Sequence, residues 1–294
     1  MLRSLKGIEK YKVSATDGDV GSVANFLVDD VGWAVRYLVV DTGGLLGGRE
    51  VLITPIAFRE VDYPANRFRL LLTIDKIKAS PSVNLDLPVS RQYESEYNGY
   101  YGYPGYWGWG GLWGPGRSPG GLASGEPDAS RSRLGEPPGD AHLRSAKDVT
   151  GYHIEATDGA IGHVKDFLVD DETWEVRYMV VATANWWPGK SVLISPAWAT
   201  RISWLDRKVY VGMTREAIRT SPEWNPTQQV AAAYEQELYR HYAGLPGWVG
   251  RDRSLEPTTQ SEDTTNARVA RTEQRQVREA DAAVVTDARQ GRLP

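Results

Sequence analysis

The sequence predicts a mainly β protein built from two tandem small β-barrels, each followed by a short helix. Three observations indicate this fold. The phrase ATDGDVGSVANFLVDD at 15–30 returns as ATDGAIGHVKDFLVDD at 156–171, a constant 141 positions later. Both copies continue into a segment rich in Val, Tyr and Trp, residues that favour strands. Further short strand signals, separated by turn signals, follow at the close spacing typical of a small barrel.

The repeat defines the domain organisation. The match continues without a gap, so we expect one barrel unit with its trailing aromatic segment at 2–107 and a second unit with a C-terminal helix at 143–248. A Gly- and Pro-rich linker at 108–142 separates them. The charged segment at 249–294 is predicted to be disordered, with a transient helix near 266–283.

A β-hairpin is predicted at the end of each repeated phrase. The strands at 21–30 and 33–40 are separated by Val31-Gly32, which suits a two-residue loop. The expected cross-strand pairs are Asp30 with Trp33, Val28 with Val35, and Phe26 with Tyr37. Leu27 and Asp29 then share the other face with Arg36.

The remaining elements of a unit are short. GREVLITP at 48–55 predicts a strand closed by proline, and the segment at 58–73 predicts strand, turn and strand. IDKIKASP at 74–81 predicts a helical turn that Ser-Pro ends.

A helix is expected at 226–243 in the second unit. Its apolar residues recur every fourth position and form one face: Val230, Tyr234, Leu238 and Tyr242. Its counterpart in the first unit is weaker, because Gly99 and Gly102 are expected to cut that helix short.

The hairpins carry the most prominent candidate site. Its residues are Asp29, Asp30, Trp33 and Arg36 in the first copy, and Asp170, Asp171, Trp174 and Arg177 in the second. In the second copy Glu175 and Asp170 are expected beside Arg177. One interpretation is a contact surface or an acidic cation site. The interpretation we favour is a hairpin turn with a cross-strand ion pair, because Asp is common in turns.

Composition argues against several classes of function. The chain has no cysteine, and its four histidines show no metal-ligand spacing, so we expect no metal site and no cofactor. No nucleophile and base are visible beside the carboxylates, so we expect no enzyme activity and no catalytic residue. Four glycines are interpreted as turn glycines rather than a phosphate-binding loop: Gly18, Gly21, Gly159 and Gly162.

The aromatic stretch YYGYPGYWGWGGLW at 100–113 permits three interpretations. It is a recognition segment, it lies at a membrane interface, or it folds back over a barrel opening or the second unit. The third interpretation is the simplest. A membrane anchor normally adds basic residues, and none occurs in this stretch before Arg117.

The motifs together resemble the PRC-barrel family, the small β-barrel of the photosynthetic reaction-centre H subunit and of the C-terminal domain of a ribosome-maturation factor. In the first copy the resemblance rests on Asp17-Gly18, Gly21, FLVDD at 26–30, Trp33, VRYLVVDTG at 35–43 and GREVLITP at 48–55. In the second copy it rests on Asp158-Gly159, Gly162, FLVDD at 167–171, Trp174, VRYMVV at 176–181 and GKSVLISP at 189–196. The second copy departs from the pattern at Ala182 and Ala184, so the two units are not expected to share one binding surface. The family is known for assembly and interaction, which the resemblance implies here as well.

The expected function is therefore a non-catalytic scaffold or adaptor of bacterial origin that binds a protein partner. The alternatives are a peripheral accessory or assembly factor of a photosynthetic or electron-transport complex, and a ribosome or RNA-processing assembly factor. A net charge near −4 argues against direct nucleic-acid binding. No window has the length of a membrane span or a signal peptide, so a cytoplasmic location is expected, with peripheral association at the inner membrane as the alternative. The two units are expected to pair with each other or to form a homodimer.

Overall fold

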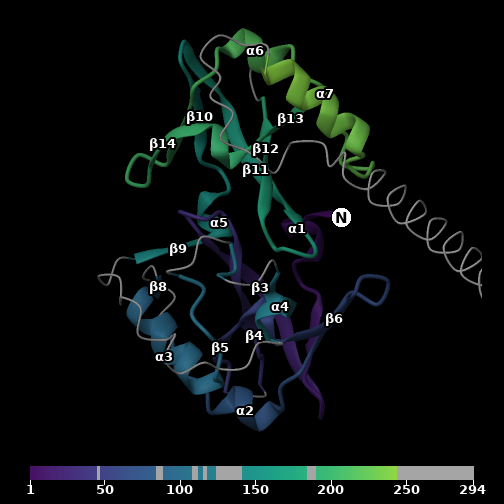
Figure 1. The fold of residues 1–294 in the computed structure, drawn as a ribbon, viewed down its shortest axis with the longest axis vertical. Helices are drawn as coiled ribbons and strands as arrows, with labels where there is room; N and C mark the ends of the chain where they lie inside the picture. The colour runs from purple at the N-terminus through teal and green to yellow at the C-terminus, as the bar shows by residue number, and fades with distance from the viewer. Residues whose placement is uncertain are drawn as a thin grey trace, which may run out of the picture. The chain divides into compact units, whose positions relative to one another are not determined.

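The structure is a computed structural model, and it describes most of both repeats (Figure 1). The described residues are 1–44, 47–83, 89–107, 112–114, 118–123, 141–183 and 190–243. The predicted charged tail at 249–294, with its expected helix near 266–283, lies outside them, as does most of the linker. Both repeats belong to one compact unit, Met1–Arg251.

The protein is mainly β, as predicted, and its described strands form two sheets. The main strands of the first sheet are β2 (Lys12–Ser14), β3 (Asp19–Asp29), β4 (Val35–Asp41), β5 (Glu50–Ile53), β6 (Phe58–Asp62) and β7 (Arg67–Leu70). Those of the second sheet are β10 (His153–Ala156), β11 (Gly159–Asp170), β12 (Val176–Ala182), β13 (Ser191–Ile194), β14 (Ala199–Ser203) and β15 (Lys208–Val211). Three further strands are β1 (Leu2–Ser4), β8 (Val89–Ser90) and β9 (Ala141–Ser145).

The two sheets have the same topology. The strand order β5-β4-β3-β2-β7-β6 in the first repeats as β13-β12-β11-β10-β15-β14 in the second. One pair in each sheet is parallel, β2 with β7 and β10 with β15. Among the described strands no pairing joins the two ends of either order, so the predicted closed barrels are not confirmed.

β-Bulges recur at equivalent places in both sheets. In the long central pair, the register shifts between Val23 and Asn25 and again between Leu27 and Val28. The second sheet shifts between Val164 and Asp166 and between Leu168 and Val169. Bulges bend a strand and increase its twist, so each sheet curls in the same way.

One bulge changes the predicted hairpin register. Val28 faces Val35 as expected, but the bulge places Leu27 opposite Tyr37 and Phe26 opposite Leu38. The predicted pairing of Phe26 with Tyr37 is therefore wrong. The turn is also longer than predicted, because the Trp33 N–H donates to the Asp29 carbonyl at 2.8 Å and the Asp29 N–H donates to the Ala34 carbonyl at 2.9 Å.

Short helices connect and flank the strands. The helical elements are α1 (Leu5–Ile8), η1 (Pro55–Ala57), α2 (Ile74–Lys78), α3 (Arg91–Tyr101), α4 (Pro119–Ala123), α5 (Ala146–Val149), η3 (Pro196–Trp198), α6 (Arg215–Arg219) and α7 (Ala232–Ala243). The helical turns predicted before each Ser-Pro are α2 and α6. No helix within the described residues has both the length and the apolar character needed to cross a membrane.

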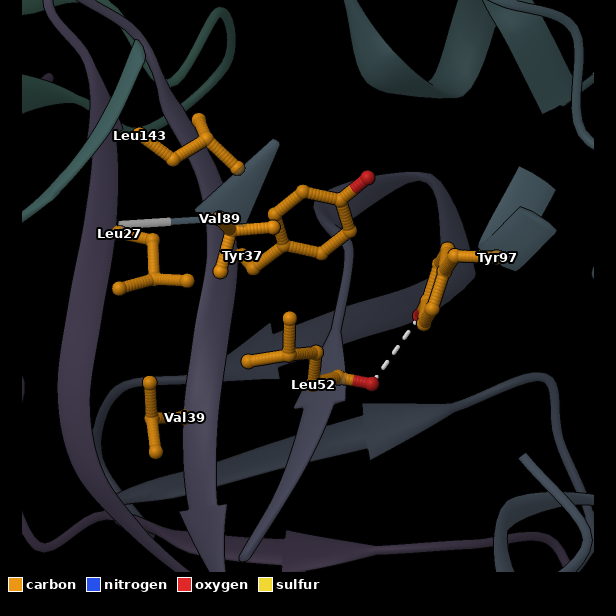
Figure 2. Packing of buried hydrophobic residues seen from close by; sticks show 7 residues of the cluster. All are labelled: Leu27, Tyr37, Val39, Leu52, Val89, Tyr97 and Leu143. Carbon is orange, nitrogen blue, oxygen red and sulfur yellow. Dashed lines mark hydrogen bonds between the residues drawn. The ribbon is translucent and has the colours of Figure 1, made fainter. Parts of the chain in front are cut away.

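Helix α3 is longer than the sequence predicted. Gly99 lies inside it, and only Gly102, in the left-handed conformation with φ 78°, ends it. Packing explains the difference, since Tyr97 is fully buried and its hydroxyl donates to the Leu52 carbonyl of β5 at 3.0 Å (Figure 2). Tertiary packing of this kind overrides the weak helix propensity of glycine.

The core of the first repeat contains a residue from the second. Leu143 of β9 packs with the buried residues around β3 and β4 (Figure 2). The other members of this cluster are Leu27, Tyr37, Val39, Leu52, Val89 and Tyr97. Strand β9 thus belongs to the second repeat in sequence and to the first sheet in space.

Two of the four predicted turn glycines lie inside strands. Gly21 is in β3 and Gly162 is in β11, whereas Gly18 lies in the bend before β3 and Gly159 starts β11 with φ 132°. A Cβ at Gly21 would lie 2.0 Å from the Asp41 carbonyl oxygen of the neighbouring strand. The turn interpretation is therefore wrong for Gly21 and Gly162, where close backbone approach requires glycine.

We predict that Gly21→Ala lowers the free energy of unfolding by more than about 2 kcal/mol, because β3 and β4 must separate to admit the new methyl group. Urea unfolding followed by circular dichroism measures this change. Gly44→Ala is the control, since a Cβ at Gly44 has no neighbour within 4 Å. Equal unfolding midpoints for the two variants would show that the close approach is not required.

Candidate functional site

The two repeated hairpins meet at their tips. The Val35 N–H donates to the Trp174 carbonyl at 2.8 Å. The equivalent bond runs the other way, from the Val176 N–H to the Trp33 carbonyl, at 2.7 Å. An isolated antiparallel bridge between Ala34 and its partner in the second tip completes the junction. The two hydrogen bonds that join the tips are equivalent, because Val35 corresponds to Val176 and Trp33 to Trp174 in the repeat.

Each repeat also gives its first strand to the other sheet. Strand β1 pairs antiparallel with β11, and β9 pairs antiparallel with β3. The registers are equivalent, since Ser4 faces Leu168 and Ser145 faces Leu27. The exchange makes the described part of the two repeats a pseudo-symmetric pair within one chain.

An arginine on each exchanged strand links the two repeats. Arg144 of β9 donates to Asp30 in the first hairpin at 2.8 Å, and its guanidinium lies 4.4 Å from the ring centroid of Trp204 in the second repeat. Burial raises the pKa of Asp30, and the contact with Arg144 opposes that rise. The equivalent contacts in the other half join Arg3 to Asp171 at 3.0 Å and to the ring of Tyr63 at 3.9 Å.

The two hairpin tryptophans support this junction. Both Trp33 and Trp174 have positive φ, 51° and 59°, a conformation that side chains rarely adopt. Trp174 is buried, and its ring lies 5.3 Å from that of Phe58 and 6.0 Å from that of Phe68. The second hairpin thus packs a large side chain into the first repeat, which helps to maintain the unfavourable backbone conformation.

Asp29 combines the two structural roles that the favoured interpretation gave it. One carboxylate oxygen accepts the backbone N–H groups of Val31 at 2.9 Å and Gly32 at 3.1 Å, which closes the turn. The other accepts from Arg36 at 3.0 and 3.2 Å. Burial alone would raise the pKa of Asp29, but Arg36 and the two backbone N–H groups hold that pKa below its ordinary value.

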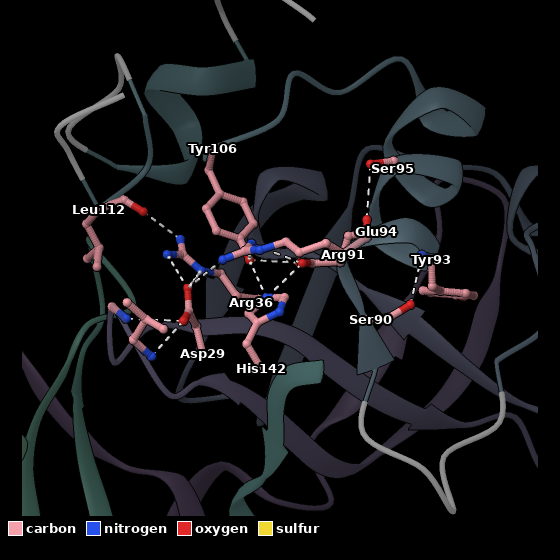
Figure 3. A network of polar contacts seen from close by, with 12 residues as sticks. Asp29, Arg36, Ser90, Arg91, Tyr93, Glu94, Ser95, Tyr106, Leu112 and His142 are labelled. Carbon is pink, nitrogen blue, oxygen red and sulfur yellow. Dashed lines mark hydrogen bonds and ion pairs between the residues drawn. The ribbon is translucent and has the colours of Figure 1, made fainter. Parts of the chain in front are cut away.

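The Arg36 guanidinium is almost fully buried, and the ring of Tyr106 lies beside it (Figure 3). It lies 3.6 Å from the ring centroid of Tyr106 and 4.7 Å from that of Trp113. It also donates to the Leu112 carbonyl at 2.6 Å. Stacking and hydrogen bonding thus compensate this buried cation in addition to the carboxylate of Asp29.

Glu94 of α3 is the second buried acid of this cluster, with no exposed surface. It accepts from Arg91 at 3.1 Å and from the Tyr106 hydroxyl at 2.8 Å, and it lies 2.9 Å from His142 Nε2 (Figure 3). These three partners come from the same helix, from the segment after it and from the exchanged strand β9. Glu94 therefore ties the helix and the second repeat to the hairpin.

The second repeat contains a reduced version of this cluster. Asp170 closes its turn by accepting from the backbone of Glu172 at 3.0 Å and Thr173 at 2.8 Å. Arg177, which the sequence predicted beside Asp170 and Glu175, forms a salt bridge with Glu235 of α7 at 3.4 Å. The Tyr178 hydroxyl also donates to Glu235, at 2.9 Å.

Sequence reasoning missed Arg91, Glu94, Tyr106 and His142 as members of the site. A signal for one of them was present, because Glu94 recurs as Glu235 at the repeat distance. The other three have Ala232, Gly247 and Met1 at the equivalent positions, so the repeat could not reveal them. Only the structure brings them to the hairpin.

The aromatic stretch folds back over this site in the part that the structure describes. Tyr106 is 6% exposed and Trp113 is 1% exposed. The Trp113 indole N–H donates to the Thr173 carbonyl in the second hairpin at 2.5 Å. Of the three interpretations of this stretch, folding back describes these residues.

The arrangement is suited to holding elements together. Its acids and arginines bond to one another, to backbone groups and to aromatic rings. Among the described residues no group of three or more His, Asp or Glu could hold a metal ion. Comparison with models of known protein families gives no match, and a search among curated proteins gives no match either.

We predict that Asp29→Asn lowers the free energy of unfolding by about 3 kcal/mol at neutral pH, because it leaves Arg36 buried without its counter-charge. The ordinary pKa of an Asp side chain is about 4, and the fold lowers the pKa of Asp29 below it. Ionised Asp29 therefore stabilises the folded protein fully above about pH 4. This stabilisation is lost as the pH falls through the lowered pKa. The difference between the variant and the wild type should therefore shrink below about pH 4. Urea unfolding across pH measures it.

The control for this variant is Glu60→Gln, which removes one acid of an exposed pair with Arg69. Such a pair contributes at most about 1 kcal/mol. A loss for Asp29→Asn no larger than that of the control would contradict the structural role assigned to the buried pair.

A second prediction concerns Asp166, which occupies the position of Asn25 in the other repeat and contacts Ser4 of the exchanged strand. Burial raises the pKa of Asp166, so the fold disfavours its ionised form. Asp166→Asn should therefore raise the free energy of unfolding at neutral pH, and the gain should vanish as pH falls through the raised pKa and the wild-type carboxyl takes up its own proton.

Asn25→Asp is the matched control, and it should destabilise the protein at neutral pH because it buries a new carboxylate. Urea unfolding at several pH values tests both variants. A neutral-pH loss of stability in Asp166→Asn that persists at low pH would show that the carboxylate has a favourable role.

Proposed function

We propose that this chain is a non-catalytic protein-interaction scaffold made of two PRC-type barrels fused into one body. The shared strand order and the recurring bulges support the barrel assignment, since both curl each sheet in the same way. The motifs that resemble the PRC-barrel family fall on these strands and on the hairpins between them. The curved sheets are the surfaces that the scaffold presents.

The reciprocal junction of the two hairpins carries this proposal. The polar residues of the repeated phrase could have formed a binding or catalytic site. Asp30 and Asp171 instead accept from arginines of the exchanged strands, and Asp29 accepts from Arg36 within its own hairpin. Their role is thus to hold the two repeats together. A chain whose repeated polar residues join its two repeats into one compact pair is suited to presenting surfaces to other proteins.

The paired surfaces are related but unequal, as a scaffold with distinct faces requires. Leu205 is 95% exposed and Val31 is 79% exposed, whereas Pro64 and Glu172 occupy the equivalent positions. Single exposed apolar residues are common on protein surfaces and do not by themselves mark a binding site. Their exposure makes them suitable positions for cross-linking probes.

The test uses the full-length chain with a photo-cross-linking amino acid at Val31, Leu71 or Leu205, all of them exposed. The chain is incubated with soluble and membrane fractions of the native host. We expect a protein to cross-link at one of these positions and to form a complex of fixed stoichiometry when both proteins are purified. Light scattering after size exclusion measures that stoichiometry.

The fraction that contains the partner distinguishes the versions of this function. A membrane-complex subunit would favour an accessory role in electron transport, and ribosomal proteins would favour an assembly role. The absence of a reconstituted complex from either fraction, with correctly folded protein, would contradict the scaffold proposal.

A further inference from the structure

The described part of the aromatic segment consists of Tyr103–Trp107 and Leu112–Gly114, which we name the strap. Apart from an isolated bridge at Trp113, it contains no regular secondary structure. Two of its side chains, Tyr106 and Trp113, are almost fully buried and fix it to the rest of the protein. This mode of binding resembles that of an extended peptide on a receptor surface.

The first repeat provides a specific site for Tyr106. Its ring is contacted by two cations, with Arg36 at 3.6 Å and Arg91 at 4.8 Å from the ring centroid. Its hydroxyl donates to Glu94 at 2.8 Å (Figure 3). The cations favour an aromatic ring, and the buried carboxylate favours a ring that carries a hydroxyl group.

A second site binds the other end of the strap. Arg36 donates to the Leu112 carbonyl at 2.6 Å, and the Trp113 indole N–H donates to Thr173 in the second hairpin at 2.5 Å. The site for Trp113 therefore includes both repeats. It exists only when the hairpins are paired.

Part of the receptor recurs in the second repeat, whereas the two buried side chains of the strap occur only in the first. Two residues of the receptor recur at the repeat distance, Arg36 as Arg177 and Glu94 as Glu235. Tyr106 and Trp113 do not recur, since Gly247 and Ser254 hold the equivalent positions. The second repeat thus keeps the central arginine and glutamate of this surface without the two side chains that occupy it.

We propose that the surface formed by Arg36, Arg91, Glu94 and Thr173 is a binding site for an aromatic peptide of a partner protein, and that the strap is its internal ligand. The inference rests on the scaffold function proposed above and assigns the partner's chemistry. The partner segment carries a Tyr followed, seven positions later, by a Trp, as Tyr106 and Trp113 are spaced here. It binds when it displaces the strap.

The strap controls access to this site. A tethered ligand acts at an effective concentration on the order of millimolar, so the wild-type protein binds an external peptide weakly. The apparent dissociation constant rises in inverse proportion to the fraction of molecules in which the site is open. Removing the strap side chains should therefore strengthen binding of the external peptide.

The probe is a fluorescein-labelled peptide with the sequence of residues 103–114, YPGYWGWGGLWG. It is titrated against the full-length wild-type protein and the full-length double variant Tyr106→Ser/Trp113→Ser, and fluorescence anisotropy measures binding. We expect the double variant to bind at least about tenfold more tightly than the wild type. Tyr100→Ser is the matched protein control, because Tyr100 is an aromatic residue of α3 outside the strap, and it should bind like the wild type.

Variants of the peptide test the chemistry without affecting the protein fold. Peptides carrying Tyr106→Phe or Trp113→Phe lose one hydrogen bond each, to Glu94 and to Thr173, and should bind the double variant more weakly. A peptide of scrambled sequence should not bind. Equal affinities for the original, substituted and scrambled peptides would overturn the assignment, since they would show nonspecific aromatic binding.

Thermal melting establishes whether the double variant is folded. If it is folded and binds the peptide no better than the wild type, the proposal is wrong. If it is unfolded, Trp113→Phe in the full-length chain replaces it, because this variant keeps a six-membered aromatic ring and loses the five-membered ring that carries the indole N–H. This variant should still bind the peptide more tightly than the wild type, and unchanged affinity would also overturn the proposal.

The outcome is separable from that of the scaffold proposal. If the wild type and the strap variant capture a partner equally and neither binds the peptide, the scaffold proposal stands and the peptide-site proposal is wrong. If the peptide binds but no partner is captured, the peptide site stands and the scaffold proposal is wrong.

Discussion

The two backbone hydrogen bonds that join the hairpin tips are the constraint on which the rest of the structure depends. They run from Val35 to Trp174 and from Val176 to Trp33, and they fix the tips in one relative position. In this arrangement each exchanged strand pairs with the long strand of the other repeat, β1 with β11 and β9 with β3. Leu143 then completes the core of a repeat to which it does not belong in sequence. The two repeats therefore form one compact unit, in which each sheet includes a strand from the other repeat.

The departures from this symmetry are concentrated on one side. Both repeats keep an acid that closes the turn and a glutamate on the following helix, Asp29 with Glu94 and Asp170 with Glu235. The first repeat adds further cationic and aromatic groups around Glu94 and Arg36, and the strap contributes Tyr106 and Trp113. Buried ion pairs add little net stability, because desolvation offsets much of the attraction, but an unmatched partner is costly. The cluster therefore favours the one arrangement in which helix, hairpin, strap and β9 all supply their groups.

The sequence was sufficient to predict the features that are local or repeated. The constant spacing of the two phrases predicted two similar units, and strand-favouring residues between turn signals predicted a mainly β fold. The contact between Asp29 and Arg36 followed from their common strand face. The exchange of β1 and β9 could not be predicted, because a three-residue strand such as Leu2–Ser4 carries no signal for which sheet it joins. The bulge beside Leu27 and the close approach at Gly21 depend on the neighbouring strand, which local patterns do not specify. Tyr106 and His142 were missed because they are far from the hairpin in sequence and have no counterpart in the second repeat.

Native-state hydrogen exchange tests most directly whether the two repeats form one cooperative unit. The amide groups of β3 and β11 are compared in the full-length protein at increasing, sub-denaturing concentrations of denaturant. Strand exchange predicts that the slowest amides of both strands converge on a single free energy of opening, because neither sheet can open globally while the other stays intact. Two separate free energies, with one repeat protected while the other exchanges, would contradict the account and show that the repeats fold as independent domains.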